Sequence, residues 1–267
     1  MRWQRTAAIL LRQFYLLRGS PARILPLFAW VGIDIVLWGF LSRYLNAITA
    51  TRLNFVPALL GAVLLWDFFI RIMQGVTTAF LEDVWSRNFL NFFASPLTVS
   101  EYVSGLVLSS ILTSLVGLAA MLVLATSVFG LSFFIYGATA GPFLFVLFLS
   151  GIALGVFATG LVLWQGPAAE WLVWPMPALI SPFAAVFYPR ATLPPWMWAV
   201  SRILPQSYVF ENLRAIVSGH APSAAALLGA IVLAFAYILL AAWFFTGIFR
   251  RAVRTGLIAR YSAETLN

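Results

Sequence analysis

The chain has 267 residues, of which 63% are hydrophobic and 9% are charged, with a formal net charge of +8 and a mean hydropathy of +0.97. This composition excludes a water-soluble fold and predicts an all-α integral membrane protein with one domain, residues 1–267. We expect the positive charge to set the orientation of the chain in the membrane and to contact lipid headgroups, and we expect no nucleic acid as partner. The absence of cysteine excludes disulfides and thiol chemistry, and because all sixteen basic residues are arginine, no lysine is present for an ATP-binding phosphate loop.

Residues 2–18 have the pattern of an amphipathic helix. At helical spacing the apolar side chains fall on one face and the arginines on the other; the two sets are Trp3, Ala7, Leu10, Phe14 and Leu17, and Arg2, Arg5 and Arg12. Such a segment lies in the membrane surface rather than crossing it. The sequence Gly19-Ser20-Pro21 ends the predicted helix.

Six segments are long and apolar enough to cross a bilayer, which takes about 20 residues as a helix. They are predicted near residues 23–45, 55–80, 100–129, 140–165, 168–188 and 222–248. In the fourth, Gly151 and Gly155 form a GxxxG pattern with Gly160 beyond it, which predicts close helix packing.

The region from 168 to 218 is the least regular part of the predicted membrane domain. Pro175, Pro177 and Pro182 would each free a backbone carbonyl, so we expect the fifth span to be kinked or interrupted. Residues 190–218 fit two short external helices, with Pro195 in the first turn of one and Gly219 capping the other.

The distribution of arginine predicts the orientation. With both termini in the cytoplasm, ten arginines lie inside and five outside, as the positive-inside rule favours. The inside set is Arg2, Arg5, Arg12, Arg18, Arg23, Arg87, Arg250, Arg251, Arg254 and Arg260, and the outside set is Arg43, Arg52, Arg190, Arg202 and Arg214.

A polar segment, residues 82–96, separates the second and third spans. At helical spacing its apolar and polar side chains fall on opposite faces; these are Leu81, Trp85, Phe89 and Phe92, and Asp83, Arg87 and Asn91. The pattern predicts a short helix on the membrane surface that offers its polar side to a soluble partner. Arg87 is also placed to pair with Asp83 one turn away.

Three charged residues lie inside predicted spans. Asp67 and Arg71 are four apart, so they can form an intrahelical pair with either a structural role or a role toward substrate or protons. Asp34 has Trp30 and Trp38 at its i±4 positions, so it must meet another helix or line a pathway. Near the other end, Glu211 and Arg214 share a helix face, either as an external gate or as interfacial side chains.

Two stretches resemble ABC-2 type transporter permeases. The segment after the family's second span is similar to Phe80-Leu81-Glu82-Asp83-Val84-Trp85-Ser86-Arg87-Asn88, Ala94-Ser95-Pro96-Leu97 and Glu101-Tyr102-Val103-Ser104-Gly105. The loop before its last span is similar to Tyr188-Pro189, Leu193-Pro194-Pro195-Trp196, Leu204-Pro205 and Glu211-Asn212-Leu213-Arg214. Order, spacing and span count agree over nearly the whole chain.

The resemblance implies the transmembrane subunit of a bacterial ABC exporter in the plasma (inner) membrane. It would pair with a second permease copy, as a homodimer or with a related chain, and with two P-loop ATPase subunits that bind ATP and Mg, while this chain is no enzyme and holds no cofactor. Residues 2–18 and 82–96 would contact the ATPase, and 190–218 would be extracellular re-entrant helices. The ATPase-coupling residues would be Glu82, Asp83, Trp85, Arg87 and Asn88. An amphiphilic or lipid-like substrate would move outward.

Two alternatives belong to other classes. An ATPase-independent carrier would more often show inverted repeats, which are not visible here. An intramembrane lipid-modifying enzyme would need convergent acidic groups, for which the candidates are Asp34, Asp67 and Glu170. No metal site or catalytic set is indicated, since His220 is the single histidine.

Overall fold

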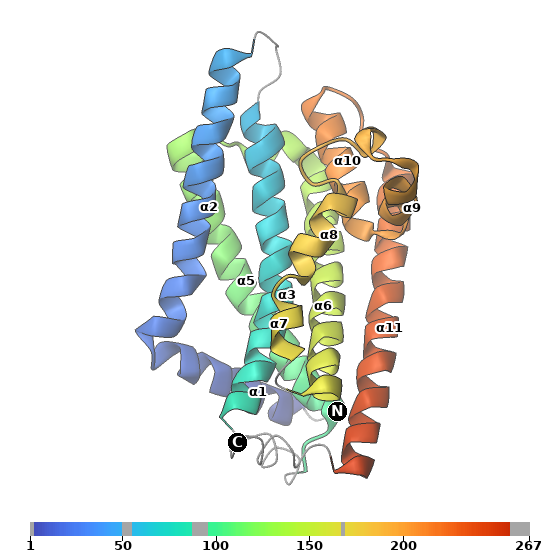
Figure 1. Cartoon of the computed structure of the whole chain (residues 1–267). Coiled ribbons are helices and arrows are strands. Elements are labelled where there is room, and N and C mark those ends of the chain that lie inside the picture. Colours follow the sequence, from blue (N-terminus) through green and yellow to red (C-terminus); the bar gives the residue numbers. More distant parts are fainter. Residues whose placement is uncertain (1–2, 50–54, 87–95, 167–168, 257–267) are drawn as a thin grey trace.

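The computed structural model describes residues 3–49, 55–86, 96–166 and 169–256, and every regular element in these ranges is helical. The elements are α1 (Trp3–Arg18), α2 (Pro21–Ile48), η1 (Val56–Leu60), α3 (Gly61–Trp85), α5 (Val99–Phe129), η2 (Phe133–Thr139), α6 (Ala140–Gln165), α7 (Glu170–Val173), α8 (Met176–Ala184), η4 (Arg190–Thr192), α9 (Pro195–Ile203), α10 (Pro205–Val217) and α11 (Ala224–Thr255). The long helices form an elongated bundle, with α1 crossing one end and α9 and α10 at the other (Figure 1).

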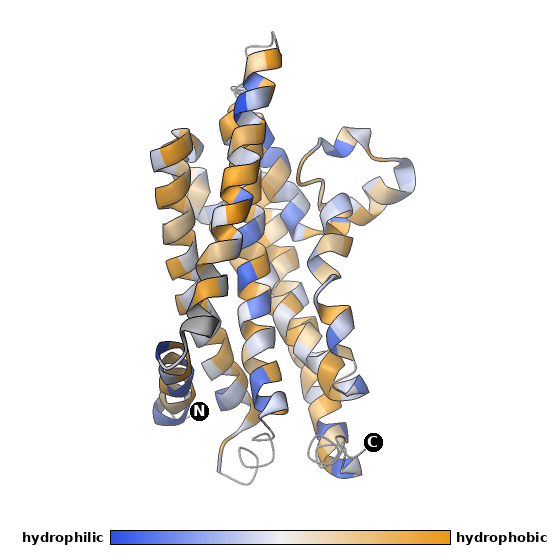
Figure 2. Cartoon of the chain, turned by 60° about the vertical axis from the view of Figure 1, so that its left-hand side comes forward, coloured by the Kyte–Doolittle hydropathy of each residue, from blue (hydrophilic) through white to orange (hydrophobic). Residues whose placement is uncertain are grey.

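Five helical segments in the described ranges have the length and apolar composition to cross a membrane. They are Phe28–Ile48, Val56–Trp85, Val99–Phe129, Phe133–Gln165 and Ala224–Thr255. Figure 2 shows that hydrophobic residues cover most of the length of these helices. Large apolar side chains on the outside of α11, such as Leu239 at 70% and Trp243 at 77% exposure, suit contact with lipid rather than water. The part of the chain that the structure describes is therefore all-α and has the character of a multi-pass membrane protein.

The segment predicted as the fifth span, 168–188, does not form one continuous helix. Its described part contains α7, with 4 residues, and α8, with 9 residues, which meet at Trp174 and Pro175. Proline has no backbone N–H to donate and its ring crowds the preceding turn, so the predicted interruption is confirmed. In Figure 1 this segment climbs beside the bundle from the lower end of α6 towards α10. A sixth crossing of the membrane would therefore consist of this interrupted segment.

Helix α3 lies at the centre of the bundle between α5 and α6. Glycines in α6 allow the two backbones to approach closely. A Cβ atom added at Gly151 would lie 3.0 Å from the carbonyl oxygen of Phe69, and one at Gly155 would lie 2.9 Å from that of Met73. Further along α6, Gly160 faces Phe244 of α11 at a similar distance of 2.9 Å. The predicted role of this glycine pattern in close packing is confirmed.

The two short helices predicted within 190–218 are present. Pro195 is the first residue of α9, where its missing N–H is not needed. Gly219 follows α10 with a φ of +78°, and the N–H of His220 donates to the carbonyl of Ala215 over 2.8 Å. This left-handed turn ends the helix as glycine permits.

Helix α1 confirms the amphipathic segment predicted at 2–18, but it presents a different face to the bundle. Its buried residues are Thr6, Ile9 and Gln13. Ile9 packs onto Gly105 of α5, where an added Cβ would lie 2.6 Å from the Ile9 side chain. Phe14, on the predicted apolar face, is 56% exposed.

The glycine packing generates a prediction in which two identical substitutions have opposite effects. Gly155→Ala should lower the free energy of unfolding by about 1–3 kcal/mol, because the new methyl group meets the α3 backbone. Gly229→Ala, at a helical position with nothing within 4 Å of the new atom, should instead stabilise by about 0.5–1 kcal/mol through helix propensity. Thermal unfolding of the purified variants in detergent measures both; equal shifts of the same sign would contradict the packing model.

Candidate functional site

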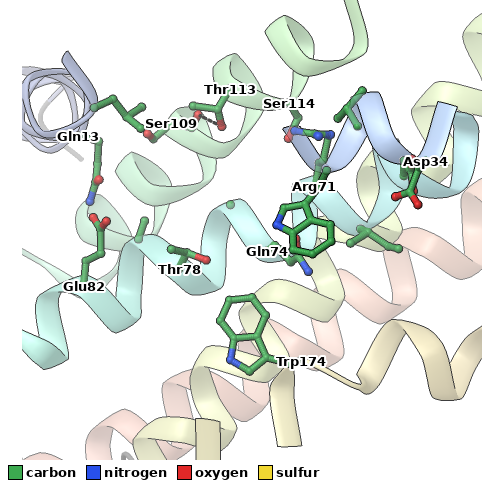
Figure 3. Close-up of a pocket in the computed structure, with 17 residues that line it drawn as sticks. Gln13, Asp34, Arg71, Gln74, Thr78, Glu82, Ser109, Thr113, Ser114 and Trp174 are labelled. Atoms are coloured by element: carbon green, nitrogen blue, oxygen red, sulfur yellow. Dashed lines mark hydrogen bonds between the residues drawn. The ribbon is translucent and has the colours of Figure 1, made fainter. Parts of the chain in front are cut away.

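A cavity of about 660 Å³ opens between α1, α2, α3, α5 and α7. Its polar lining residues are Gln13, Asp34, Asp67, Arg71, Gln74, Thr78, Glu82, Ser109, Thr113 and Ser114. Figure 3 shows these side chains, apart from Asp67, on helices that are far apart in sequence, with Trp174 on the α7 side. The structure thus unites the three predicted intramembrane polar residues in one site, together with Glu82 of the predicted coupling set.

Half of these polar lining residues come from one stripe on α3. Asp67, Arg71, Gln74, Thr78 and Glu82 follow one another at intervals of four, three, four and four residues. This spacing keeps successive side chains on one helix face. The sequence spacing therefore indicates that the charged residues Asp67 and Arg71 share a helix face with Glu82, which begins the polar segment after the span.

The predicted intrahelical ion pair of Asp67 and Arg71 is not formed. Both residues are described, and no ion pair within 4.0 Å joins them. Oδ2 of Asp67 and Nε of Arg71 are buried without hydrogen-bond partners. The guanidinium instead lies against α5, where a Cβ on Gly117 would be 3.0 Å from Arg71 Nη1. Arg71 nevertheless interacts electrostatically with both Asp67 and Asp34, so the three form one charge cluster.

Six polar cavity residues were missed by the sequence reasoning: Gln13, Gln74, Thr78, Ser109, Thr113 and Ser114. Two of them are almost fully buried. Gln13 of α1 is 4% exposed and Ser114 of α5 is 2% exposed, and neither Gln13 Nε2 nor Ser114 Oγ has a hydrogen-bond partner. In Figure 3 the Gln13 amide points towards the carboxylate of Glu82. No sequence pattern identifies Gln13, because its position depends on how α1 crosses the bundle.

Asp83 lies at the end of α3 and is fully buried, so the prediction that it faces water is wrong. Its Oδ1 forms an ion pair of 2.5 Å with Nη1 of Arg12, and its Oδ2 accepts a hydrogen bond of 2.7 Å from the hydroxyl of Tyr102. A carboxylate is stable in such a place only when it is paired and hydrogen-bonded. The buried Tyr102 and the α1 arginine provide both conditions.

A second contact of the same kind ties α1 to the start of α5. Glu101 and Thr98 form a capping box, in which Glu101 Oε2 accepts from the Thr98 N–H over 3.0 Å and the Thr98 side chain accepts from the Glu101 N–H. Glu101 also pairs with Nη1 of Arg5 over 3.5 Å, and the same arginine donates to the carbonyl of Pro96. Arg5 and Arg12, which the sequence places on the face opposite the apolar side chains, thus turn towards the protein. We call these two ion-pair contacts, Arg12–Asp83 and Arg5–Glu101, the α1 latch.

Glu170 of α7 joins the end of α3 to the cavity wall. Its Oε2 accepts from the indole N–H of Trp85 over 3.1 Å, and its Oε1 accepts from that of Trp174 over 3.3 Å. Trp85, a predicted coupling residue, is therefore connected through one carboxylate to a tryptophan that lines the cavity.

The remaining coupling residues, Arg87 and Asn88, lie outside the described residues, as does most of the predicted helix 82–96. The described part of that segment continues α3 as far as Trp85, so Glu82 and Asp83 belong to the last turns of the spanning helix. A pairing of Asp83 with Arg87 is not described, whereas the pairing of Asp83 with Arg12 is.

Glu211 and Arg214 share a face of α10 as predicted, at the opposite end of the bundle from α1 (Figure 1). Glu211 Oε1 accepts from Arg214 Nη2 over 2.7 Å and from the backbone N–H of Arg190 over 2.8 Å. Arg214 also donates to the carbonyl of Val186 over 3.2 Å. Burial lowers the pKa of Arg214, and the Glu211 carboxylate opposes that shift. These contacts hold the loop after α8 on α10, and neither residue lines the cavity.

Comparison with known proteins found no matching family model and no matching curated protein. The function is therefore argued from the residues and geometry above.

The α1 latch generates a prediction about local stability. Arg12→Ala leaves the buried Asp83 carboxylate without its cation, and the loss of such a partner costs about 3–5 kcal/mol. We expect the amides of residues 3–18 to exchange hydrogen faster, by about tenfold or more, as α1 detaches from α5. Arg18→Ala removes an exposed arginine from the same helix and should leave the exchange unchanged. Equal exchange in the two variants would show that the latch does not hold α1.

Proposed function

We propose that the chain is the transmembrane permease subunit of an ABC-type exporter in the bacterial plasma membrane, with both termini in the cytoplasm. It acts with a second permease copy and with two separate P-loop ATPase subunits that bind ATP and Mg. The substrate is an amphiphilic or lipid-like molecule that moves outward. The multi-pass helical fold, the absence of lysine and the resemblance of residues 80–105 and 188–214 to ABC-2 permeases support this proposal.

The observation that carries the proposal is the course of α3. One helix holds Asp67 and Arg71 at the cavity, and its last turns hold Asp83 in the α1 latch. A subunit that docks at this end, against α1 and the segment after α3, can therefore move the cavity wall directly. Transport driven by ATP requires such a mechanical connection, because nucleotide binding must favour one conformation over the other by differential contacts.

The topology is consistent with the proposed orientation. Helix α1, the end of α3 and the end of α11 lie at one end of the bundle, whereas α9 and α10 lie at the other (Figure 1). In the proposed topology the interrupted α7–α8 segment is the fifth of six crossings. The arginine-rich ends of α1 and α11 then face the cytoplasm together.

An intramembrane enzyme is the second candidate, because Asp34 and Asp67 line the same cavity. Its third acidic candidate, Glu170, accepts hydrogen bonds from Trp85 and Trp174, which positions these two side chains instead. The exporter is therefore the better-supported function.

Co-expression of the tagged chain with any P-loop ATPase that is encoded beside its gene tests the proposal. We expect a stoichiometric complex that hydrolyses ATP. In that complex Arg87→Ala combined with Asn88→Ala should reduce the rate of substrate-stimulated hydrolysis by about fivefold or more, which corresponds to a loss of about 1 kcal/mol. Membrane abundance should not change.

Arg202→Ala is the control for this experiment, because Arg202 stacks on Trp198 in α9 at the far end of the bundle. Its hydrolysis should equal that of the unsubstituted complex. A chain that is stable alone and retains no ATPase would contradict the exporter proposal.

A further inference from the structure

The charges at the cavity do not balance. Asp34 and Asp67 face one guanidinium, that of Arg71, and among the described lining residues Arg71 is the one cation. Towards α1 the lining adds a further carboxylate, that of Glu82. The part of the cavity around Arg71 therefore holds two carboxylates for one guanidinium. An unbalanced charge inside the membrane is costly, so it marks a candidate functional site.

The cavity also contains buried polar atoms with no partner in the protein. Ser114 and Gln13 are more than nine-tenths buried, and Ser114 Oγ and Gln13 Nε2 have no hydrogen-bond partner. Asp67 Oδ2 and Arg71 Nε are two further such atoms. Buried polar groups are nearly always satisfied, so four unsatisfied atoms around one cavity indicate a polar occupant.

The size and walls of the cavity restrict that occupant. A volume of about 660 Å³ lies within the range of sites that enclose drug-sized ligands. Trp30 and Trp174 line it together with the apolar Leu17, Val31 and Ile70. Indole faces attract organic cations as well as apolar groups. An inorganic ion would leave most of these walls without contact.

We propose that the cavity binds a monovalent organic cation with an apolar body, its positive charge placed between Asp34 and Asp67 and its body against Trp30 and Trp174. One part of this proposal rests on the proposed function, namely that the bound cation is the exported substrate. The site lies within one copy of the chain, so the binding itself needs neither the ATPase nor ATP.

The test uses two probes of the same shape and opposite charge. Tetraphenylphosphonium is a permanent monovalent cation, and tetraphenylborate is its anionic counterpart. The purified full-length chain, without ATPase, is equilibrated with each radiolabelled probe in lipid nanodiscs, and empty nanodiscs are measured in parallel. We expect saturable binding of tetraphenylphosphonium above the level of empty nanodiscs, and none of tetraphenylborate.

Substitutions then locate the binding. Asp34→Asn and Asp67→Asn keep the side-chain shape and remove one charge, so each should raise the dissociation constant of tetraphenylphosphonium by about tenfold or more. Glu211→Gln is the matched control, because it neutralises a carboxylate on α10 that does not line the cavity. It should leave the dissociation constant unchanged. Size-exclusion profiles verify that each variant is folded.

The comparison of the two probes on the unsubstituted chain remains decisive if a variant does not fold. Saturable binding of tetraphenylborate alone, of both probes equally, or of neither, would overturn the proposal, as would equal cation affinity in Asp34→Asn, Asp67→Asn and Glu211→Gln. Cation binding by a chain that retains no ATPase would contradict the exporter proposal and support the cation site. An ATPase complex that binds no cation would support the exporter proposal and contradict the cation site.

Discussion

The burial of charge in α3 is the constraint on which the rest of this structure depends. The helix is enclosed by α5 and α6, yet it carries Asp67, Arg71 and Asp83. In a low-dielectric setting each charge requires a partner, a hydrogen bond or access to water. The protein meets this requirement differently at the two ends of the helix. In the last turn of α3, Asp83 is buried and paired with Arg12. Around Asp67 and Arg71, in contrast, the bundle leaves a cavity.

These two solutions depend on each other through α1. The helix that supplies Arg12 to Asp83 also supplies Gln13 to the cavity lining, one residue further along the chain. Close packing of Ile9 on Gly105 fixes the height at which α1 crosses α5. A shift of α1 would therefore disturb the buried ion pair and the cavity together.

The interruption between α7 and α8 has a related consequence. A continuous fifth span would follow one helical face along its length, whereas the proline break allows the short α7 to place Trp174 at the cavity and Glu170 beside Trp85. Non-helical backbone at membrane depth is tolerated where it lines a cavity or is buried in protein. The prolines thus position the wall of the site in addition to bending the chain.

The sequence by itself determined the elements of this protein. Hydrophobic length predicted five spans whose ends lie within seven residues of the helical segments, the prolines of 175–182 predicted the break, and Gly151 and Gly155 predicted a close helix contact, because each of these signals is local. It also contained the polar stripe of α3 at helical spacing.

Only the tertiary structure decided which side chains contact one another. Three features depend on which side chains from different helices meet in space. Asp83 is buried against Arg12, Asp67 and Arg71 remain apart, and Gln13 and Ser114 face the same cavity as Asp34. Periodicity fixes the face of a helix on which a residue lies, whereas the neighbour that covers that face follows from how the helices pack.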